Sequence, residues 1–204
     1  MREFHTYIAN PGPKKLEIGA CANLRPGWLS TDKDARPGVM AMDATQAFPM
    51  GSEIFDFIYS EHMIEHISFN DGQQMLRECW RVLKPGGHIR IVTPSLGFLL
   101  RVISPDAGML ERDYLEWSLT WFVPEARIKT PAFFVNNFLR AWGHTFIYDE
   151  ETLCHSLLSA GFVGLFRAKI SESVFPEFRN LENVGRLPPG FLELESMIIE
   201  AQKL

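Results

Sequence analysis

The chain has 204 residues, of which 46% are hydrophobic and 22% are charged, and these are ordinary values for a globular protein. A chain of this length buries roughly 70% of its unfolded surface as one domain. The formal net charge of -5 provides no general attraction to phosphate backbones or to anionic lipid, so nucleic acid is excluded as the default partner. We therefore expect a single domain over residues 1–204.

The location of the protein is predicted from what its sequence lacks. No stretch approaches the length of a membrane span, and the first 15 residues, MREFHTYIANPGPKK, contain no apolar signal core. The three cysteines, Cys21, Cys79 and Cys154, are widely spaced and give no zinc pattern. We expect reduced thiols, a cytoplasmic location and no membrane partner.

The first part of the chain predicts short strands. Residues 1–14 contain Pro11, Gly12 and Pro13, and we expect an irregular lead-in there. Three apolar runs follow, each ending in glycine or aspartate, at residues 15–19, 28–32 and 39–43. The spacer of Cys21 to Gly27 leaves no room for the long helix that usually joins the first two strands of a doubly wound sheet.

A strand, a helix and a second strand are predicted between residues 54 and 93. The run IFDFIYS at 54–60 is β-branched and aromatic, which favours a strand. Apolar residues recur at helical spacing over 72–83, and the sequence KPGG that follows ends the helix. HIRIVT at 88–93 is the next strand. This order predicts a βαβ unit of a parallel sheet.

Residues 95–142 are rich in aromatic side chains and are interrupted by prolines. We expect two or three short helices here, inserted over the carboxyl end of the preceding strand as a lid on the active site. The aromatic side chains are compatible with sugar, lipid-like or aromatic substrates. The insert therefore does not identify a substrate.

The last part of the chain returns to regular elements. Asp149 is expected to cap a helix that ends at Ala160 and Gly161. A strand is predicted at 162–170, followed by a turn-rich segment at 171–189 that loops outward. The final strand is predicted within 192–201, most strongly at 196–201.

Acidic residues at strand ends suggest a ligand. Asp32 and Asp43 each follow a short strand, and in parallel α/β sheets ligands bind outside the carboxyl ends of the strands. A carboxylate there can accept hydrogen bonds from ribose hydroxyls or from an adenine amine. The pattern favours a nucleoside-binding α/β edge.

Three longer motifs resemble one known family. LEIGAC at 16–21, followed by PGW at 26–28, resembles the pattern Leu-x-Leu-Gly-Cys-Gly-x-x-x-x-Pro-Gly-Trp. FDFIYSEH at 55–62, with EH at 65–66, resembles that family's fourth-strand motif, and RVLKPGG at 81–87 resembles the string before its fifth strand. On these residues the chain resembles the class I S-adenosylmethionine-dependent methyltransferases, in particular a small bacterial type 11-like subgroup. The resemblance is strong over 15–94 and looser over 145–201.

The resemblance implies both a fold and an activity. The fold would be α/β, a Rossmann-like doubly wound sheet of seven mostly parallel strands, with one antiparallel strand near the C-terminus and the helical aromatic insert. The activity would be methyl transfer from S-adenosyl-L-methionine to an unidentified small-molecule acceptor, with S-adenosyl-L-homocysteine as product. The oligomeric state is not predicted.

The resemblance also implies a cofactor site at the strand ends, made by Glu17, Gly19, Ala20, Cys21, Asp32, Asp43, Ala44, Ser60 and Glu61. Glu17 and the Gly19 loop would face the methionine part, where a missing side chain allows close approach. Asp32 would bind the ribose hydroxyls, and Asp43 with the backbone of Ala44 would meet the adenine. Ser60 and Glu61 would border the sulfonium.

One position departs from the family pattern. Cys21 replaces the second glycine of the first motif, and Ala20 precedes it. If this position requires a positive φ or a close approach, a side chain there has an energetic cost. This departure supports an alternative function, a protein that binds S-adenosylmethionine without catalysis.

Three residues are candidates for proton transfer: His62, His144 and Tyr148. Methyl transfer is an in-line displacement that depends mainly on proximity and orientation. A general base is needed only if the acceptor is a hydroxyl or a protonated amine.

Two further alternatives come from motifs. His62-Met63-Ile64-Glu65-His66 matches the inverted zinc-peptidase pattern, which would require a helix with the two histidines on one face. No third ligand can be singled out, and the sequence prediction includes no metal. A nicotinamide-dependent dehydrogenase is the weakest alternative, because no G-x-G-x-x-G precedes a full helix.

Overall fold

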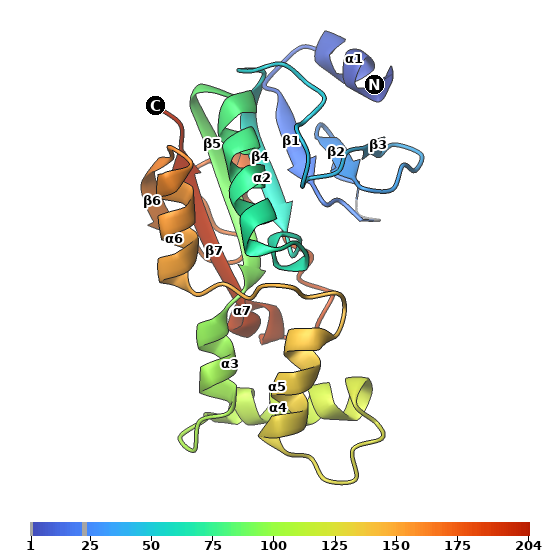
Figure 1. The fold of residues 1–204 in the computed structure, drawn as a ribbon, viewed down its shortest axis with the longest axis vertical. Coiled ribbons are helices and arrows are strands. Elements are labelled where there is room, and N and C mark those ends of the chain that lie inside the picture. The colour runs from blue at the N-terminus through green and yellow to red at the C-terminus, as the bar shows by residue number, and fades with distance from the viewer. Residues whose placement is uncertain (1, 22–23) are drawn as a thin grey trace.

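The computed structural model describes residues 2–21 and 24–204. In these residues seven strands form one sheet in the order β3-β2-β1-β4-β5-β7-β6 (Figure 1). The strands are β1 (Lys15–Ile18), β2 (Leu29–Asp32), β3 (Met40–Ala41), β4 (Phe55–Glu61), β5 (Leu83–Pro94), β6 (Val163–Arg167) and β7 (Ser196–Gln202). Strand β7 pairs antiparallel with both of its neighbours, and the other pairs are parallel. The predicted fold class is confirmed.

Strand β1 lies where the strand order reverses. Leu16 pairs with Leu29 of β2 on one side and with Ile58 of β4 on the other. The chain therefore adds β2 and β3 on one side of β1 and the remaining strands on the other. The carboxyl ends of β1 and β4 form the switch point at which α/β sheets bind ligands.

The helical elements of the described residues are α1 (Arg2–Ala9), η1 (Ile64–His66), α2 (Phe69–Val82), α3 (Leu96–Val102), α4 (Met109–Phe122), α5 (Pro131–Arg140), α6 (Glu150–Ser159), η2 (Pro176–Phe178) and α7 (Phe191–Glu195). None of them is long and apolar enough to cross a membrane. Asp149 caps α6 as predicted, because its side chain accepts a hydrogen bond from the Thr152 amide.

Two helices near the chain ends were not predicted: the irregular lead-in expected at 1–14 was wrong, whereas the final strand expected most strongly at 196–201 is confirmed as β7. Helix α1 occupies part of the expected lead-in, where Phe4 and Tyr7 pack against the main core. The Tyr7 hydroxyl also donates to the Gly27 carbonyl (3.1 Å) and accepts from the Lys15 amide (2.6 Å). Near the C-terminus, α7 precedes the final strand, and its Phe191 packs against Tyr114 of α4 (4.8 Å between ring centroids). Both helices depend on contacts with distant parts of the chain.

Helices α2 and α6 cover one face of the sheet (Figure 1). Their buried residues Met75, Leu76, Leu153 and Leu157 join the strands in one apolar core. Helices α3, α4 and α5 lie beyond the carboxyl ends of the strands and share a second, aromatic cluster. The predicted helical insert is present there, and its three helices agree with the expected number.

The other face of the sheet is covered by the segment 169–182. Its Phe178 is fully buried and lies against Trp28 (6.4 Å between ring centroids) and Phe57 (5.3 Å). The sequence analysis expected this turn-rich region to loop outward. It packs inward because these aromatic rings bury apolar surface on the strands.

A buried arginine on the sheet binds the segment 169–182 through ion pairs and hydrogen bonds. Arg90 on β5 has no exposed surface and pairs with Glu182 (2.7 Å) and with Glu200 on β7. Its guanidinium also donates to the carbonyls of Lys169 (2.9 Å) and Glu172 (3.0 Å). Every side of the guanidinium is thus matched by an acceptor, as a buried charge requires.

We expect Arg90→Ala to lower the free energy of unfolding by about 3–5 kcal/mol, because it leaves two buried carboxylates without a partner. Urea unfolding followed by circular dichroism measures this change. Arg77→Ala is the matched control: Arg77 is exposed, its side chain bonds to Gln74, and its loss should cost less than about 0.5 kcal/mol. Equal effects of the two variants would contradict the anchoring role of Arg90.

Candidate functional site

The loop after β1 begins with a glycine that cannot be replaced without strain. Gly19 has φ +75°, and a Cβ there would lie 2.4 Å from Cγ of Met63. The amides of Gly19 and Ala20 both donate to the Thr31 carbonyl (2.9 Å each). The loop is thereby held against the end of β2.

Cys21 adopts the positive φ that the sequence analysis considered for this glycine position. Its φ is +49°, in the left-handed region that costs energy for a residue with a Cβ. Its amide donates to Oδ2 of Asp32 (2.9 Å), so the Asp32 carboxylate holds the loop in place. The position is one where glycine would be less strained.

The two predicted nucleoside ligands lie at the ends of neighbouring strands. Asp32 ends β2 and Asp43 follows β3, and the Met42 amide donates to the Asp32 carbonyl (2.8 Å). Asp43 accepts hydrogen bonds from the amide (2.9 Å) and hydroxyl (2.7 Å) of Thr45, both at Oδ1. These bonds lower the pKa of Asp43, so the carboxylate is ionised at neutral pH. Ala44, beside it, packs against the main core.

An arginine that the sequence analysis did not identify lies between Glu17 and Glu61. Arg25 pairs with the buried carboxylate of Glu17 and, at 2.7 Å, with Glu61 at the end of β4. Its guanidinium carbon lies 4.7 Å from the ring centroid of Tyr59. Arg25 falls in a variable position of the first motif, so no sequence signal marked it.

The end of the segment 169–182, together with Asn183 after it, completes this region. The Leu181 carbonyl accepts from Nε (3.2 Å) and Nη2 (2.8 Å) of Arg25. The Asn183 amide donates to Glu61 (3.2 Å). Ser60, which pairs with Ile18 across β1 and β4, has a buried hydroxyl with no hydrogen-bond partner among the described residues. The predicted methionine and sulfonium residues are thus brought together at the switch point.

A cavity of about 370 Å³ lies next to this region. Its lining includes the aromatic side chains of Tyr114, Trp117, Phe122, Phe138 and Trp142. It also includes the polar side chains of His62, Glu65, His66, His144, Arg186 and Glu195. Its size and its mixture of apolar walls with a few polar groups are typical of small-molecule sites.

His62 connects the two regions, since it follows Glu61 directly and lines the cavity. Its Nε2 lies 3.0 Å from Nη2 of Arg186 and 3.2 Å from the Ser196 hydroxyl. Because an arginine can only donate, Nε2 must be an acceptor, and the ring proton lies on Nδ1, 3.3 Å from Glu65. His62 is thus held in one tautomer.

The other two predicted catalytic residues have different surroundings. His144 lines the cavity, and its Nδ1 donates to the Phe138 carbonyl (2.6 Å), which leaves Nε2 with a free lone pair. Burial lowers the pKa of His144 and favours the neutral ring. Tyr148 is fully buried in the main core and is not part of the described cavity wall. A Cβ on Gly72 would lie 2.5 Å from its hydroxyl.

The geometry required by the zinc-peptidase pattern is not formed. His62 follows the end of β4 with φ +47°. Within residues 62–66 the only helical turn is η1, the 3-10 turn of Ile64–His66. His62 and His66 therefore do not share a face of an α-helix. The motif residues instead form a tight turn at the cavity wall.

Two polar residues of the cavity, Arg186 and Glu195, were also missed from the sequence. They pair at 2.9 Å, and the Tyr114 hydroxyl donates to the other oxygen of Glu195. Burial and the Glu195 charge raise the pKa of Tyr114, which keeps it a hydrogen-bond donor. Neither residue belongs to a sequence motif. Both reach the cavity wall only because residues 171–195 fold across the end of the sheet.

The comparisons with known proteins agree with this geometry. Residues 17–91 match the family model of a methyltransferase domain. The resemblance to the class I methyltransferases is confirmed. No curated protein matches the sequence.

Two solved structures share this methyltransferase fold. A SAM-dependent methyltransferase from Archaeoglobus fulgidus is 15% identical with a TM-score of 0.54, and the match covers 99% of this chain and 90% of that one. A SAM-dependent methyltransferase from Thermotoga maritima is 16% identical with a TM-score of 0.50, and the match covers 99% and 87% of the two chains. At these identities the likeness shows the fold of the methyltransferase domain.

The left-handed conformation of Cys21 predicts that a glycine variant at this position is more stable than an alanine variant. At a position with negative φ, alanine is more stabilising than glycine by about 0.4–1 kcal/mol. At Cys21 we expect the reverse, with Cys21→Gly more stable than Cys21→Ala by about 0.5–1 kcal/mol, because both lack the thiol and only glycine relieves the strain. Urea unfolding of the two variants measures the order. A more stable alanine variant would show that Cys21 is not held at positive φ.

Proposed function

We propose that the protein transfers a methyl group from S-adenosylmethionine to a small-molecule acceptor bound in the aromatic cavity. The observation that carries the proposal is the position of Asp32, at the end of β2 and hydrogen-bonded to the Gly19–Cys21 loop. A carboxylate at this place suits two vicinal ribose hydroxyls, and the ionised Asp43 one strand further suits the adenine.

The charges at the switch point suit the amino-acid end of this cofactor. Two carboxylates, Glu17 and Glu61, lie on either side of one guanidinium, Arg25. The zwitterionic amino-acid end of the cofactor carries both complementary charges. Its carboxylate would pair with Arg25 in place of one glutamate, and its ammonium would pair with the glutamate that Arg25 releases. The unpartnered Ser60 hydroxyl offers a further polar contact there.

The neighbouring cavity suits the acceptor. S-adenosylmethionine would supply an electrophilic methyl group on its sulfonium. Glu61 and His62 are consecutive, so the proposed sulfonium border and the cavity wall meet at this peptide. The chain's own contribution would be to hold the acceptor against this border and to exclude water with the aromatic walls.

His144 is our first candidate as proton acceptor for a hydroxyl or a protonated amine, and His62 is the second, because Nε2 of His62 already accepts from Arg186. Both line the cavity, and the pKa of His144 is lowered by burial, so its ring is neutral and able to accept a proton at neutral pH. The structure offers no argument for Tyr148 in this role, because its hydroxyl is packed in the core.

Calorimetric titration with S-adenosylmethionine and S-adenosylhomocysteine tests the cofactor. We expect micromolar binding that Asp32→Ala weakens by at least about 100-fold, since two charge-assisted hydrogen bonds are worth about 3 kcal/mol or more. Asp34→Ala is the matched control, because Asp34 is exposed and only its backbone amide contacts Asp32 (3.3 Å). Absence of binding to the unmodified protein would overturn the proposal.

A second titration tests the role of Arg25. We expect Arg25→Met to weaken S-adenosylhomocysteine binding by about 10- to 100-fold through loss of a charged hydrogen bond. Its affinity for 5′-methylthioadenosine, which has no amino-acid end, should be unchanged. Equal losses for both ligands would mean that Arg25 only maintains the structure of the site.

A further inference from the structure

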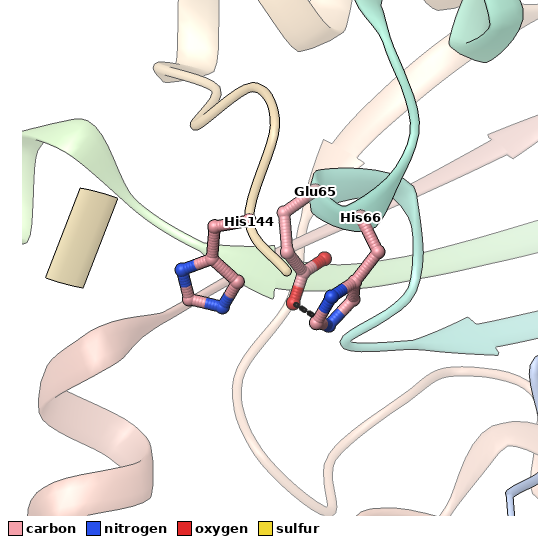
Figure 2. Close-up of side chains that lie close together, drawn as sticks. All are labelled: Glu65, His66 and His144. Carbon is pink, nitrogen blue, oxygen red and sulfur yellow. Dashed lines mark ion pairs between the residues drawn. The ribbon is translucent and has the colours of Figure 1, made fainter. Parts of the chain in front are cut away.

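Three potential metal ligands converge at the wall of the cavity. Glu65 and His66 come from the turn η1, and His144 comes from the loop between α5 and α6 (Figure 2). One ligand atom from each of the three residues can be chosen so that all lie within 4.8 Å of one another. Such a set of two imidazoles and one carboxylate lies outside the nucleoside-binding edge, and the proposed methyl transfer does not require it.

The Glu65 carboxylate is buried and has an unused oxygen. Its side chain has no exposed surface, and Oε2 accepts a hydrogen bond from the Thr93 hydroxyl (3.0 Å). Oε1 receives no hydrogen bond of normal geometry, although Nδ1 of His62 lies at 3.3 Å and Nε2 of His66 at 3.9 Å. A buried carboxylate oxygen that accepts no hydrogen bond of normal geometry thus faces the cluster.

The ring nitrogens of the two histidines are placed to bind a cation. The hydrogen bond from Nδ1 of His144 to the Phe138 carbonyl fixes the tautomer that leaves Nε2 free, the arrangement that outer-sphere carbonyls commonly give to metal-binding histidines. The rings of His66 and His144 lie 5.1 Å apart between centroids, at 64° to each other. Both line the cavity.

We propose that Glu65, His66 and His144 bind a divalent transition-metal ion. Two histidines with one carboxylate are a ligand set used for zinc and for non-haem iron. Such ions bind imidazole nitrogen at about 2.0–2.1 Å, so the side chains must close in slightly from their present separation. The attraction of the cation for the free oxygen of Glu65 favours this movement.

This set differs from the one that the His-x-x-Glu-His pattern would suggest. His62 is not a ligand, because its Nε2 accepts from Arg186 and its Nδ1 faces Glu65. Its role is to orient the Glu65 carboxylate. His144, 82 residues further along the chain than His62, takes its place, which explains why no third ligand could be found from the sequence.

Three protein ligands leave coordination positions open to the cavity, as in catalytic rather than structural metal sites. If the cavity holds the methyl acceptor, which rests on the proposed function, an oxygen of the acceptor would fill one of these positions. The metal would then lower the pKa of that oxygen. His144 would act as a ligand instead of a base.

Metal titration of the chelator-treated protein, without cofactor or acceptor, tests the site independently of the proposed function. We expect one Zn²⁺ per chain by competition with a chromophoric chelator, and a visible absorption band when Co²⁺ is bound. His66→Ala and His144→Ala should each weaken Zn²⁺ binding by at least about 100-fold, since even outer-sphere partners are worth 10- to 100-fold.

His155→Ala is the matched control, because His155 is exposed on α6 and its ring lies 3.4 Å from the Ser159 hydroxyl. It should leave the affinity unchanged. Circular dichroism confirms that each variant is folded, and His66, with 35% of its side chain exposed, is the substitution least expected to disturb the core. Absence of stoichiometric Zn²⁺ binding, or binding that survives both substitutions, would show that the cluster is only a hydrogen-bonded network.

Discussion

The buried guanidinium of Arg90 holds together three parts of this structure: β5, β7 and the segment 169–182. It joins β5 to β7 through Glu200 and to the segment 169–182 through Glu182. That segment covers one face of the sheet and then delivers the Leu181 carbonyl to Arg25. A charge buried in the sheet is therefore linked, through one stretch of irregular chain, to the groups at the switch point. The cost of burying it is offset by complete pairing.

The site has two neighbouring parts with different physical characters. The edge at β1, β2 and β4 is built from carboxylates, backbone amides and one arginine, and it suits a charged, polar ligand. The cavity beyond His62 is lined by both aromatic and polar side chains. A methyltransferase needs both parts, because the cofactor is a charged nucleoside and the acceptor must be held in line with its methyl group. The edge and the cavity meet at the carboxyl end of β4, where Glu61 belongs to the edge and His62 lines the cavity.

Several polar residues of the cavity wall are linked to one another. His62, Glu65, Arg186 and Glu195 form a continuous series of hydrogen bonds and ion pairs, with Glu65 fully buried within it. Such a network fixes tautomers and side-chain positions.

The sequence by itself determined the strands, their order of appearance and the acidic residues at the strand ends. This was possible because strand ends, glycine turns and capping residues are local, and because Asp32 and Asp43 follow directly on the strands that position them. The tertiary structure alone brought Arg25, Arg186 and Glu195 to the site. Each makes a contact that is distant in the chain: Arg25 with the Leu181 carbonyl, Arg186 with Nε2 of His62, and Glu195 with the Tyr114 hydroxyl. It also decided the helices α1 and α7, which are too short to be stable without tertiary packing.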